Sequence, residues 1–247
     1  MIVLGIDTSG TTGGLALVTE DSVISECILD VRTTYSERLM IAFDFMMRES
    51  HLSVSEIDGV AVSRGPGSYT GLRIGATVAK TLCYCLDVPL IGVSTLRAIA
   101  QSVAGLDVTA VPMIDARRDR VYASAYVFKR GDVTGTEVME EELTTVDRVI
   151  ERARELPGGL CFLGSGAIRH RETLRSRLST GFVSTDPARA LCKPSNVALI
   201  GLQALKAGKS DNVIDFSPEY LRPSSAEMRW NETRRGGNSL DLKANCT

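Results

Sequence analysis

Asp7 ends a strand-like apolar run and opens a turn of small hydroxyl residues, an arrangement that can hold a metal-bound nucleotide phosphate. The run is Ile2–Ile6, and the turn continues with Thr8, Ser9 and a glycine. Small side chains leave backbone N–H groups free to meet a phosphate. The turn is therefore a candidate phosphate-binding site.

A second aspartate, Asp115, ends the apolar run Val108–Ile114 in the same way. Its turn continues over Ala116–Arg120, with the sequence ARRDR, and contains no glycine. The bulky charged side chains occupy the space in which a phosphate would need bare backbone. The second turn is therefore a poor phosphate site, and this argues against an active kinase or ATPase.

A glycine pair that contacts an adenosine would complete such a site. Gly164 and Gly166 flank a serine directly after the apolar run 160–163, although a single G-x-G is a weak signal. The pattern favours a degenerate nucleotide cleft that binds no cofactor. Its vestigial candidates are Asp7, Thr8, Ser9, Asp115, Gly164 and Gly166.

Other kinds of catalytic or metal site lack the residues they need. The two histidines, His51 and His170, have no histidine three or four positions away, so the sequence offers no helical metal-binding pair. No G-x-S-x-G nucleophile motif occurs. The six cysteines have no C-x-x-C spacing, and Cys83 and Cys85 lie in an apolar stretch where a thiolate is unfavourable. We therefore expect no metal, no cofactor and no catalytic residue.

Composition is typical of a soluble globular protein. The 247 residues are 44% hydrophobic and 23% charged, with a formal net charge of −2, so no overall charge attracts RNA or a membrane surface. No basic segment precedes an apolar stretch at the N-terminus, and no uncharged run approaches the roughly 20 residues that span a bilayer. We expect a cytoplasmic protein with reduced thiols and no membrane contact.

Short apolar runs and amphipathic stretches alternate in two series, each of which begins with an aspartate-ended strand. The first series predicts strands at 2–7, 13–19, 22–30, 58–63 and 89–93 and helices at 36–51 and 70–86. The second predicts strands at 108–114, 120–128, 160–163 and 181–184 and helices near 144–155 and 195–207. Two similar halves favour a duplicated α/β fold of two lobes, each a mixed sheet flanked by helices. The alternative is a coincidence between two aspartates.

The expected boundary between the lobes lies near Gly105. The N-terminal lobe spans 1–104 and the C-terminal lobe 105–228, although the apolar helix 195–207 is able to pack back on the N-terminal lobe. Residues 229–247 contain few large apolar groups, so this tail is expected to be flexible.

The most distinctive segment is Arg64–Gly75, with the sequence RGPGSYTGLRIG. Its glycine–proline turn follows a buried strand, and a hydroxyl residue such as Ser68 can cap the helix that comes next. Within that helix Gly71, Gly75 and Ala79 form one smooth face, which permits close helix approach. The alternative is a tight strand-to-helix junction inside an ordinary α/β core.

The helix at 36–51 carries more apolar surface than one sheet needs. From Leu39 to Met47 only Asp44 is polar, so apolar side chains cover about two-thirds of the circumference or more. The excess, rich in methionine and phenylalanine, predicts a partner surface. The alternative is a helix packed between the sheet and helix 70–86. The predicted interface residues are Tyr35, Leu39, Met40, Phe43, Met46, Met47, Gly71, Leu72, Gly75, Val78 and Ala79.

Motifs along most of the chain resemble those of the TsaB (YeaZ) family, non-catalytic partners in making threonylcarbamoyladenosine beside the tRNA anticodon. They are Ile6–Ser9, Ser36–Leu39, Gly65–Gly75, Gly92–Leu96, Ile114–Arg118, Pro218–Arg222 and Ala226–Glu227. The block over 65–75 is highly specific. The resemblance implies a duplicated actin/Hsp70-like fold (ASKHA, ribonuclease H-like) and the role of a scaffold.

The resemblance also implies partners. A member of this family pairs with its catalytic paralogue TsaD through the first two long helices of the N-terminal lobe. It forms homodimers there when TsaD is missing, engages the ATPase TsaE, and meets tRNA only within the complex. Where many members read H-S-E, this chain reads Tyr35-Ser36-Glu37, so no histidine remains where the paralogue binds its metal. The competing hypothesis is an autonomous ATPase or sugar-kinase-like phosphotransferase of the same fold.

Overall fold

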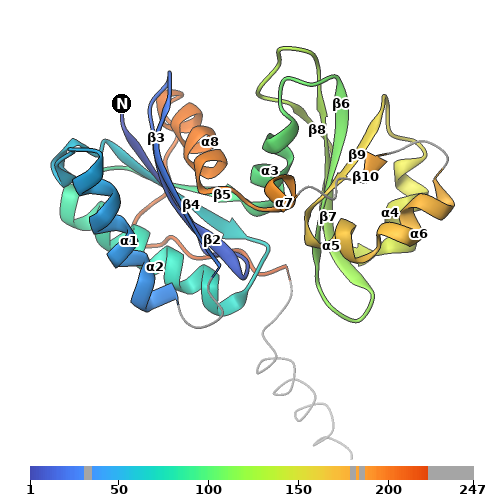
Figure 1. Ribbon diagram of the computed structural model, residues 1–247, viewed down its shortest axis with the longest axis horizontal. Helices are drawn as coiled ribbons and strands as arrows, with labels where there is room; N and C mark the ends of the chain where they lie inside the picture. The colour runs from blue at the N-terminus through green and yellow to red at the C-terminus, as the bar shows by residue number, and fades with distance from the viewer. Residues whose placement is uncertain (31–34, 179–181, 184–186, 222–247) are drawn as a thin grey trace, which may run out of the picture.

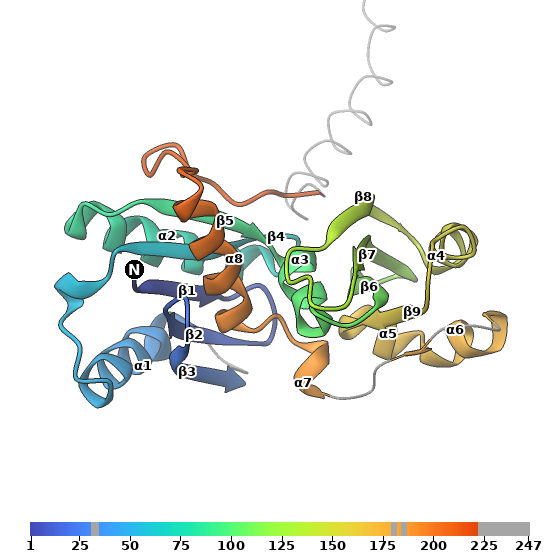
Figure 2. The same cartoon turned by 90° about the horizontal axis from the view of Figure 1, so that it is seen from above.

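Two lobes, each built on a five-stranded sheet, lie side by side (Figure 1). The computed structural model describes residues 1–30, 35–178, 182–183 and 187–221. Seen from above, α3 (Thr95–Ala100) and α8 (Pro194–Lys206) lie between the two sheets (Figure 2). The predicted tail 229–247 and the motif Ala226–Glu227 fall outside the described residues.

The N-terminal sheet has the strand order β3-β2-β1-β4-β5. The central strand β1 is antiparallel to β2 and parallel to β4, and β4 is parallel to β5. The strands are β1 (Val3–Asp7), β2 (Thr12–Val18), β3 (Val23–Asp30), β4 (Gly59–Gly65) and β5 (Leu90–Ser94).

The C-terminal sheet repeats this arrangement, with the order β10-β9-β6-β7-β8. Its first strand, β6, is antiparallel to β7 and parallel to β9, as β1 is to β2 and β4. The strands are β6 (Val108–Asp115), β7 (Arg120–Phe128), β8 (Thr136–Thr145), β9 (Leu160–Leu163) and β10 (Phe182–Val183). The matching topology confirms the prediction of a duplicated fold with two mixed sheets.

One strand, β8, does not appear among the predicted elements. It is the edge strand of the C-terminal sheet, and in it only Met139 and Thr144 are buried. Glutamates fill most of its middle, so the alternation that marks a strand is weak. The helix predicted near 144–155 is correspondingly shorter, because β8 continues to Thr145, which caps α4 (Val146–Ala153).

Helices cover both faces of each sheet. On the N-terminal sheet, α1 (Tyr35–Glu49) and α2 (Tyr69–Leu86) lie on one face, and α8 and α3 lie on the other (Figure 1). In the C-terminal lobe, α4, α5 (Gly164–Arg169) and α6 (Arg171–Arg177) cover the outer face. Three short helices complete the described chain: two 3-10 turns, Val54–Glu56 and Gln101–Val103, and α7 (Pro187–Ala190).

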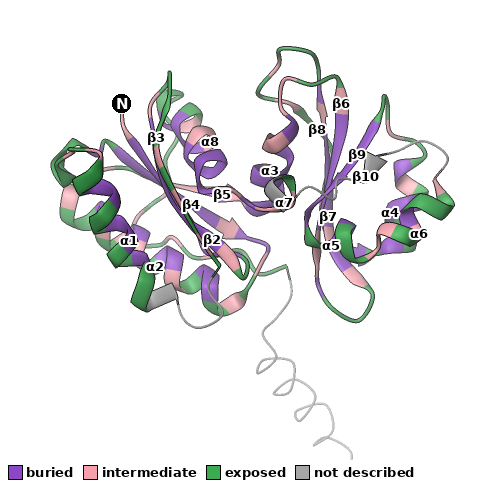
Figure 3. Cartoon of the chain, in the orientation of Figure 1, coloured by how far each residue is buried: buried purple, intermediate pink, exposed green. Residues whose placement is uncertain are grey.

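The buried side chains form one core under α1 and α2, a second between the lobes and a third beneath the outer helices of the C-terminal lobe (Figure 3). The second core joins Val3 of β1 and Val197 of α8 to Tyr126 and Leu163 of the C-terminal sheet. Because this apolar core is continuous across the boundary, the two lobes are packed on one another rather than merely linked.

The chain after α8 returns across the N-terminal lobe. Asp211 accepts a hydrogen bond from the backbone N–H of Gly92 (2.6 Å), and the backbone N–H of Glu219 donates to the carbonyl of Arg64 (2.8 Å). Helix α8 itself lies so close to β1 that a Cβ added at Gly5 would collide with it. Residues 194–221 therefore lie on the N-terminal lobe, although they belong to the second half of the sequence.

Candidate functional site

Asp7, the first candidate for a phosphate site, is completely buried at the end of β1. Its carboxylate accepts a hydrogen bond from the backbone N–H of Ser9 (3.1 Å). Burial raises the pKa of Asp7 above its ordinary value, and hydrogen bonds from Ser9 and Ser63 offset this only in part. A carboxyl group that is sealed from solvent and biased toward its neutral form is poorly suited to hold a metal-bound phosphate.

The turn after Asp7 uses its polar groups within the chain. The backbone N–H of Thr8 donates to Ser63 Oγ (3.4 Å), and Thr8 Oγ1 donates to the carbonyl of Gly71 (2.7 Å). The carbonyl of Ser9 accepts the backbone N–H of Ser68 (2.6 Å). The N–H groups of Thr8 and Ser9 are therefore already engaged, and neither is free to meet a phosphate.

The glycines of the 64–75 segment make this closure possible. A Cβ added at Gly71 would collide with the Thr8 carbonyl, one at Gly75 with Thr8 Oγ1, and one at Gly67 with the Ser9 carbonyl. Ser68 caps α2, accepting the N–H of Gly71 (3.3 Å). The segment is thus a tight strand-to-helix junction, the alternative left open by the sequence. Its smooth glycine face packs on its own chain, so Gly71 and Gly75 are not a surface for a partner.

The second candidate turn follows Asp115 and is built differently. The Asp115 carboxylate accepts the backbone N–H of Arg117 (2.9 Å) and pairs with Arg169 of α5 (2.8 Å). Gly164, at a φ of 89°, and Gly166 pack on Met113 of β6. Ser165 of α5 accepts the backbone N–H of Asp115 (3.2 Å), but Arg117–Asp119, the residues beyond Ala116, are exposed. The six vestigial candidates therefore lie at two separate turns, of which the one after Asp7 is buried and the one after Asp115 is exposed.

Helix α1 turns most of its predicted interface residues inward. Leu39, Phe43, Met46 and Met47 are all buried in the core of the N-terminal lobe, and Met46 is 1% exposed. Leu72 and Ala79 of α2 are buried as well, and Val78 is partly buried against the same core. This corrects the choice of residues: in this structure these side chains cover the sheet of their own lobe. The side chain of Tyr35 lies outside the described part of the chain.

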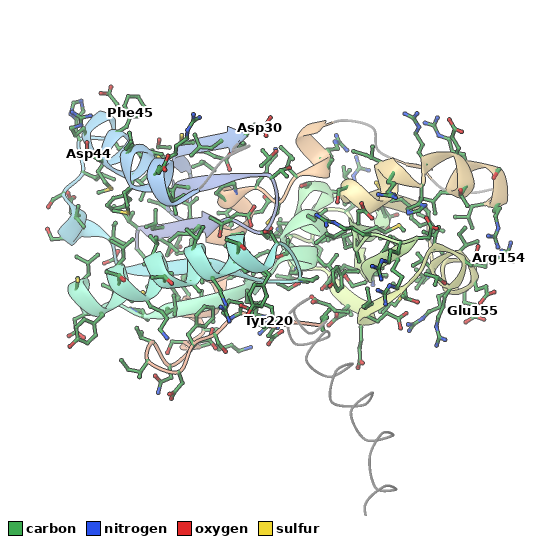
Figure 4. All side chains as sticks on the ribbon, turned by 90° about the horizontal axis from the view of Figure 1, so that it is seen from below. Asp30, Asp44, Phe45, Arg154, Glu155 and Tyr220 are labelled. Carbon is green, nitrogen blue, oxygen red and sulfur yellow. The ribbon has the colours of Figure 1, made fainter. Side chains whose placement is uncertain are left out.

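The outer face of α1 carries a different apolar set. Met40 is 44% exposed, Ile41 70% and Phe45 53%. Figure 4 shows Phe45 on the outer side of the helix, next to Asp44. Only Met40 belongs to the predicted set. Asp44 pairs with Arg48 across one helical turn (3.3 Å) on the solvent side of α1. The position of these charged residues in the sequence indicates which apolar residues of the helix face solvent.

The outer side of α2 forms a largely apolar groove of about 430 Å³. Its lining residues are Tyr69, Thr70, Arg73, Ile74, Thr77 and Val78. At one end the ring of Tyr220 packs on that of Tyr69, with 4.6 Å between centroids (Figure 4). We call this groove, together with Met40, Ile41 and Phe45 of α1, the α1–α2 surface.

The described residues offer little other chemistry. They contain no group of three or more His, Cys, Asp or Glu side chains placed to hold a metal ion. Burial raises the pKa of the Cys83 thiol to about 12, which makes it a poor nucleophile. Within the same residues, no helix has both the length and the apolar character needed to cross a membrane.

Comparison with known proteins agrees with this architecture. The family model described as "TsaD: tRNA N6-adenosine threonylcarbamoyltransferase" matches residues 30–230. The fold is shared with "YeaZ from Pseudomonas aeruginosa", at a TM-score of 0.74 and 24% identity, over 89% of this chain and 99% of that one.

Relatives named "tRNA threonylcarbamoyladenosine biosynthesis protein TsaB" include proteins of Bacillus subtilis and Escherichia coli. The protein of Bacillus subtilis is 34% identical over 95% of this chain and 100% of its own length. The protein of Escherichia coli is 29% identical over 92% of this chain and 96% of its own. The chain therefore belongs to the TsaB (YeaZ) family, within the wider TsaD family whose model it matches.

Proposed function

We propose that this protein is a non-catalytic subunit in tRNA threonylcarbamoyladenosine biosynthesis, and that it pairs with a catalytic TsaD-type paralogue through the α1–α2 surface. The role in this pathway follows from its TsaB-named relatives, which match over nearly the whole chain. The non-catalytic role and the partner are our proposal.

One observation carries the proposal: α1 exposes large apolar side chains although its inner face already fills the core. Leu39 and Met46 pack in the core of the lobe, whereas Ile41 and Phe45 leave more than half of their surface exposed. Exposed apolar side chains that gather on one face are typical of protein interfaces, and an exposed phenylalanine is the kind of anchor that dominates binding energy.

The closed β1–β2 turn supports the non-catalytic part of the proposal. A phosphotransferase of this fold needs free N–H groups and an accessible aspartate at this turn. Here Asp7 is sealed and the N–H groups of Thr8 and Ser9 bond within the chain. The competing hypothesis, an autonomous ATPase or sugar-kinase-like enzyme, therefore finds no support in this turn.

The remaining partners rest on the family alone. We propose that a TsaE-type ATPase engages the heterodimer, that tRNA is bound only by the assembled complex, and that two copies of this chain pair through the α1–α2 surface when the paralogue is missing. In the heterodimer and in the homodimer the same apolar side chains of the α1–α2 surface would be buried.

The test is a charge placed on the exposed side of α1. Phe45→Glu and Ile41→Glu should each weaken binding of the TsaD-type paralogue by about 2 kcal/mol or more, which is over tenfold in Kd. The thermal unfolding midpoint of the free chain should stay near that of the wild type, because both positions are exposed. Binding is measured by co-purification and titration calorimetry.

Val133→Glu is the matched control, since Val133 is also about half exposed but lies in the C-terminal lobe. It should bind the paralogue normally. Normal binding by all three variants would refute the proposed surface. Charges at Met46 or Gly75 are unsuitable probes, because both positions are buried and a charge there would disrupt the fold itself.

A further inference from the structure

The β6–β7 turn adopts a backbone that its residue types disfavour. Arg117, Arg118 and Asp119 have φ values of 64°, 53° and 57°, so three successive residues lie in the left-handed region. Glycine takes this conformation freely, whereas arginine has no short polar group to ease the contact between Cβ and backbone. Strained backbone of this kind is concentrated at functional sites. The two arginines are thus present at some cost to stability.

Neither arginine side chain helps to hold the turn together. The turn is fixed by its backbone, in which Ala116 N–H donates to the carbonyl of Arg120 (2.9 Å), and by Asp115, which accepts the N–H of Arg117. The side chains of Arg117 and Arg118 are exposed. Among the described residues, neither has an ion pair or a side-chain hydrogen bond. Their guanidinium groups are available to a ligand.

The surroundings of the turn leave a positive charge. Asp115 is paired with Arg169, and Asp147, at the start of α4, is paired with Arg177. Arg120 and Arg148 also lie at this end of the sheet. Arg120 pairs in register with Thr145 of β8, and Thr145 caps α4, which contains Arg148. Asp119 is the one carboxylate in the turn that is not already in such a pair. A cationic cluster of guanidinium groups fits phosphate in particular.

We propose that Arg117 and Arg118 bind the sugar-phosphate backbone of RNA. The inference rests on the proposed function, in which tRNA is present in the assembled complex. The turn lies on the C-terminal lobe and the α1–α2 surface on the N-terminal one, so the two regions can be tested by separate variants. Contacts of this type position an RNA without reading its sequence.

The experiment compares tRNA binding by wild-type and Arg117→Ala/Arg118→Ala protein, each assembled with the TsaD-type paralogue. An unmodified tRNA transcript is titrated at several salt concentrations, with fluorescence anisotropy as the readout. The double variant should bind about tenfold more weakly, and the slope of log K against log salt should fall by about one for each lost phosphate contact. Intact mass measurement reports assembly separately.

Arg130→Ala is the matched control. Arg130 is exposed and follows β7, about 30 Å from the turn at the other end of that strand, and its loss should leave affinity and salt slope unchanged. Arg118→Gly adds a second readout: it should raise the unfolding midpoint, because strain is relieved, while it weakens RNA binding.

Unchanged RNA affinity in an intact complex would overturn the inference. So would a double variant that fails to assemble, because the arginines would then contact protein, or an Arg118→Gly variant that loses both stability and binding. If wild-type protein forms no complex, the proposed function fails instead. Because tRNA is bound only by the assembled complex, the inference then falls with it.

Discussion

The β1–β2 turn and the β6–β7 turn occupy equivalent places in the two lobes but have opposite surroundings. Each follows an aspartate at the end of the first strand of its sheet. In the N-terminal lobe, α2 packs on the turn itself, because Gly71 and Gly75 contact Thr8, and Gly67 just before the helix contacts Ser9. In the C-terminal lobe, the glycines of α5 pack on Met113 and its Ser165 and Arg169 contact Asp115, while Arg117–Asp119 stay exposed. A shift of a few residues in the helix contact decides which turn is open.

The difference shows two ways in which a turn of this fold can be unsuited to bind a phosphate through its backbone N–H groups. The first turn keeps the small residues that suit a phosphate, but its space is filled by the chain. The second turn is exposed, but it carries arginines in place of the small residues. The fold therefore does not determine the function; the residues at each turn do.

The largest expected effect comes from a methyl group at the closed turn. Gly71→Ala would place a Cβ against the Thr8 carbonyl, which belongs to the backbone and cannot move aside. We expect a loss of about 3 kcal/mol in the free energy of unfolding, measured by urea denaturation. The matched change in the other lobe is Gly166→Ala, whose Cβ would lie 3.0 Å from the Cβ of Met113. Gly166→Ala should lower the free energy of unfolding by about 1 kcal/mol. Equal losses for the two variants would contradict the proposed difference in packing between the two lobes.

A smaller effect is expected at the open turn. Arg118→Gly removes the Cβ that makes a φ of 53° unfavourable, and after the entropic cost of glycine it should gain about 0.5–1 kcal/mol. Arg118→Ala keeps a Cβ and should gain nothing. The same urea experiment distinguishes the two variants, and no gain for the glycine variant would mean that the turn carries no strain.

The two aspartates should respond to amidation in opposite directions. Burial raises the pKa of Asp7 above its ordinary value of 3.8, so wild-type stability falls as pH rises from about 4 through the folded-state pKa. Asp7→Asn avoids this loss, and its advantage should be greatest at pH 8 and should vanish near pH 4. Asp115→Asn instead breaks the ion pair with Arg169 and should lose about 0.5–1 kcal/mol. The measurement is the unfolding midpoint of each variant at several pH values. A change in the same direction for both variants would contradict this expectation.

The sequence predicts the two sheets well, because strands ended by aspartate and a strand-turn-helix segment leave clear local patterns. It predicts the glycine face of α2 but not what that face touches, since Thr8 is 63 positions away from Gly71. Contacts of that kind depend on the tertiary fold. The return of residues 194–221 to the N-terminal lobe is of the same kind.

The candidate interface was harder to predict for a different reason. Nearly every residue from Leu39 to Met47 is apolar, so hydrophobicity alone does not separate the inner from the outer side of α1. The few polar residues do: Asp44 and Arg48 face solvent, and Ile41 and Phe45 lie on their side of the helix. The left-handed backbone at Arg117 and Arg118 could not be predicted from the sequence, because the turn contains no glycine; it is seen in the φ values of the folded chain.

Hydrogen–deuterium exchange tests the central claim, that α1 and α2 form the partner surface, without any mutation. Exchange of the free chain is compared with that of the chain mixed with its TsaD-type paralogue. Slower exchange should appear in peptides from α1 and α2 and not in peptides from the β6–β7 turn. Protection confined to the C-terminal lobe, or no protection at a concentration where a complex forms, would contradict the account.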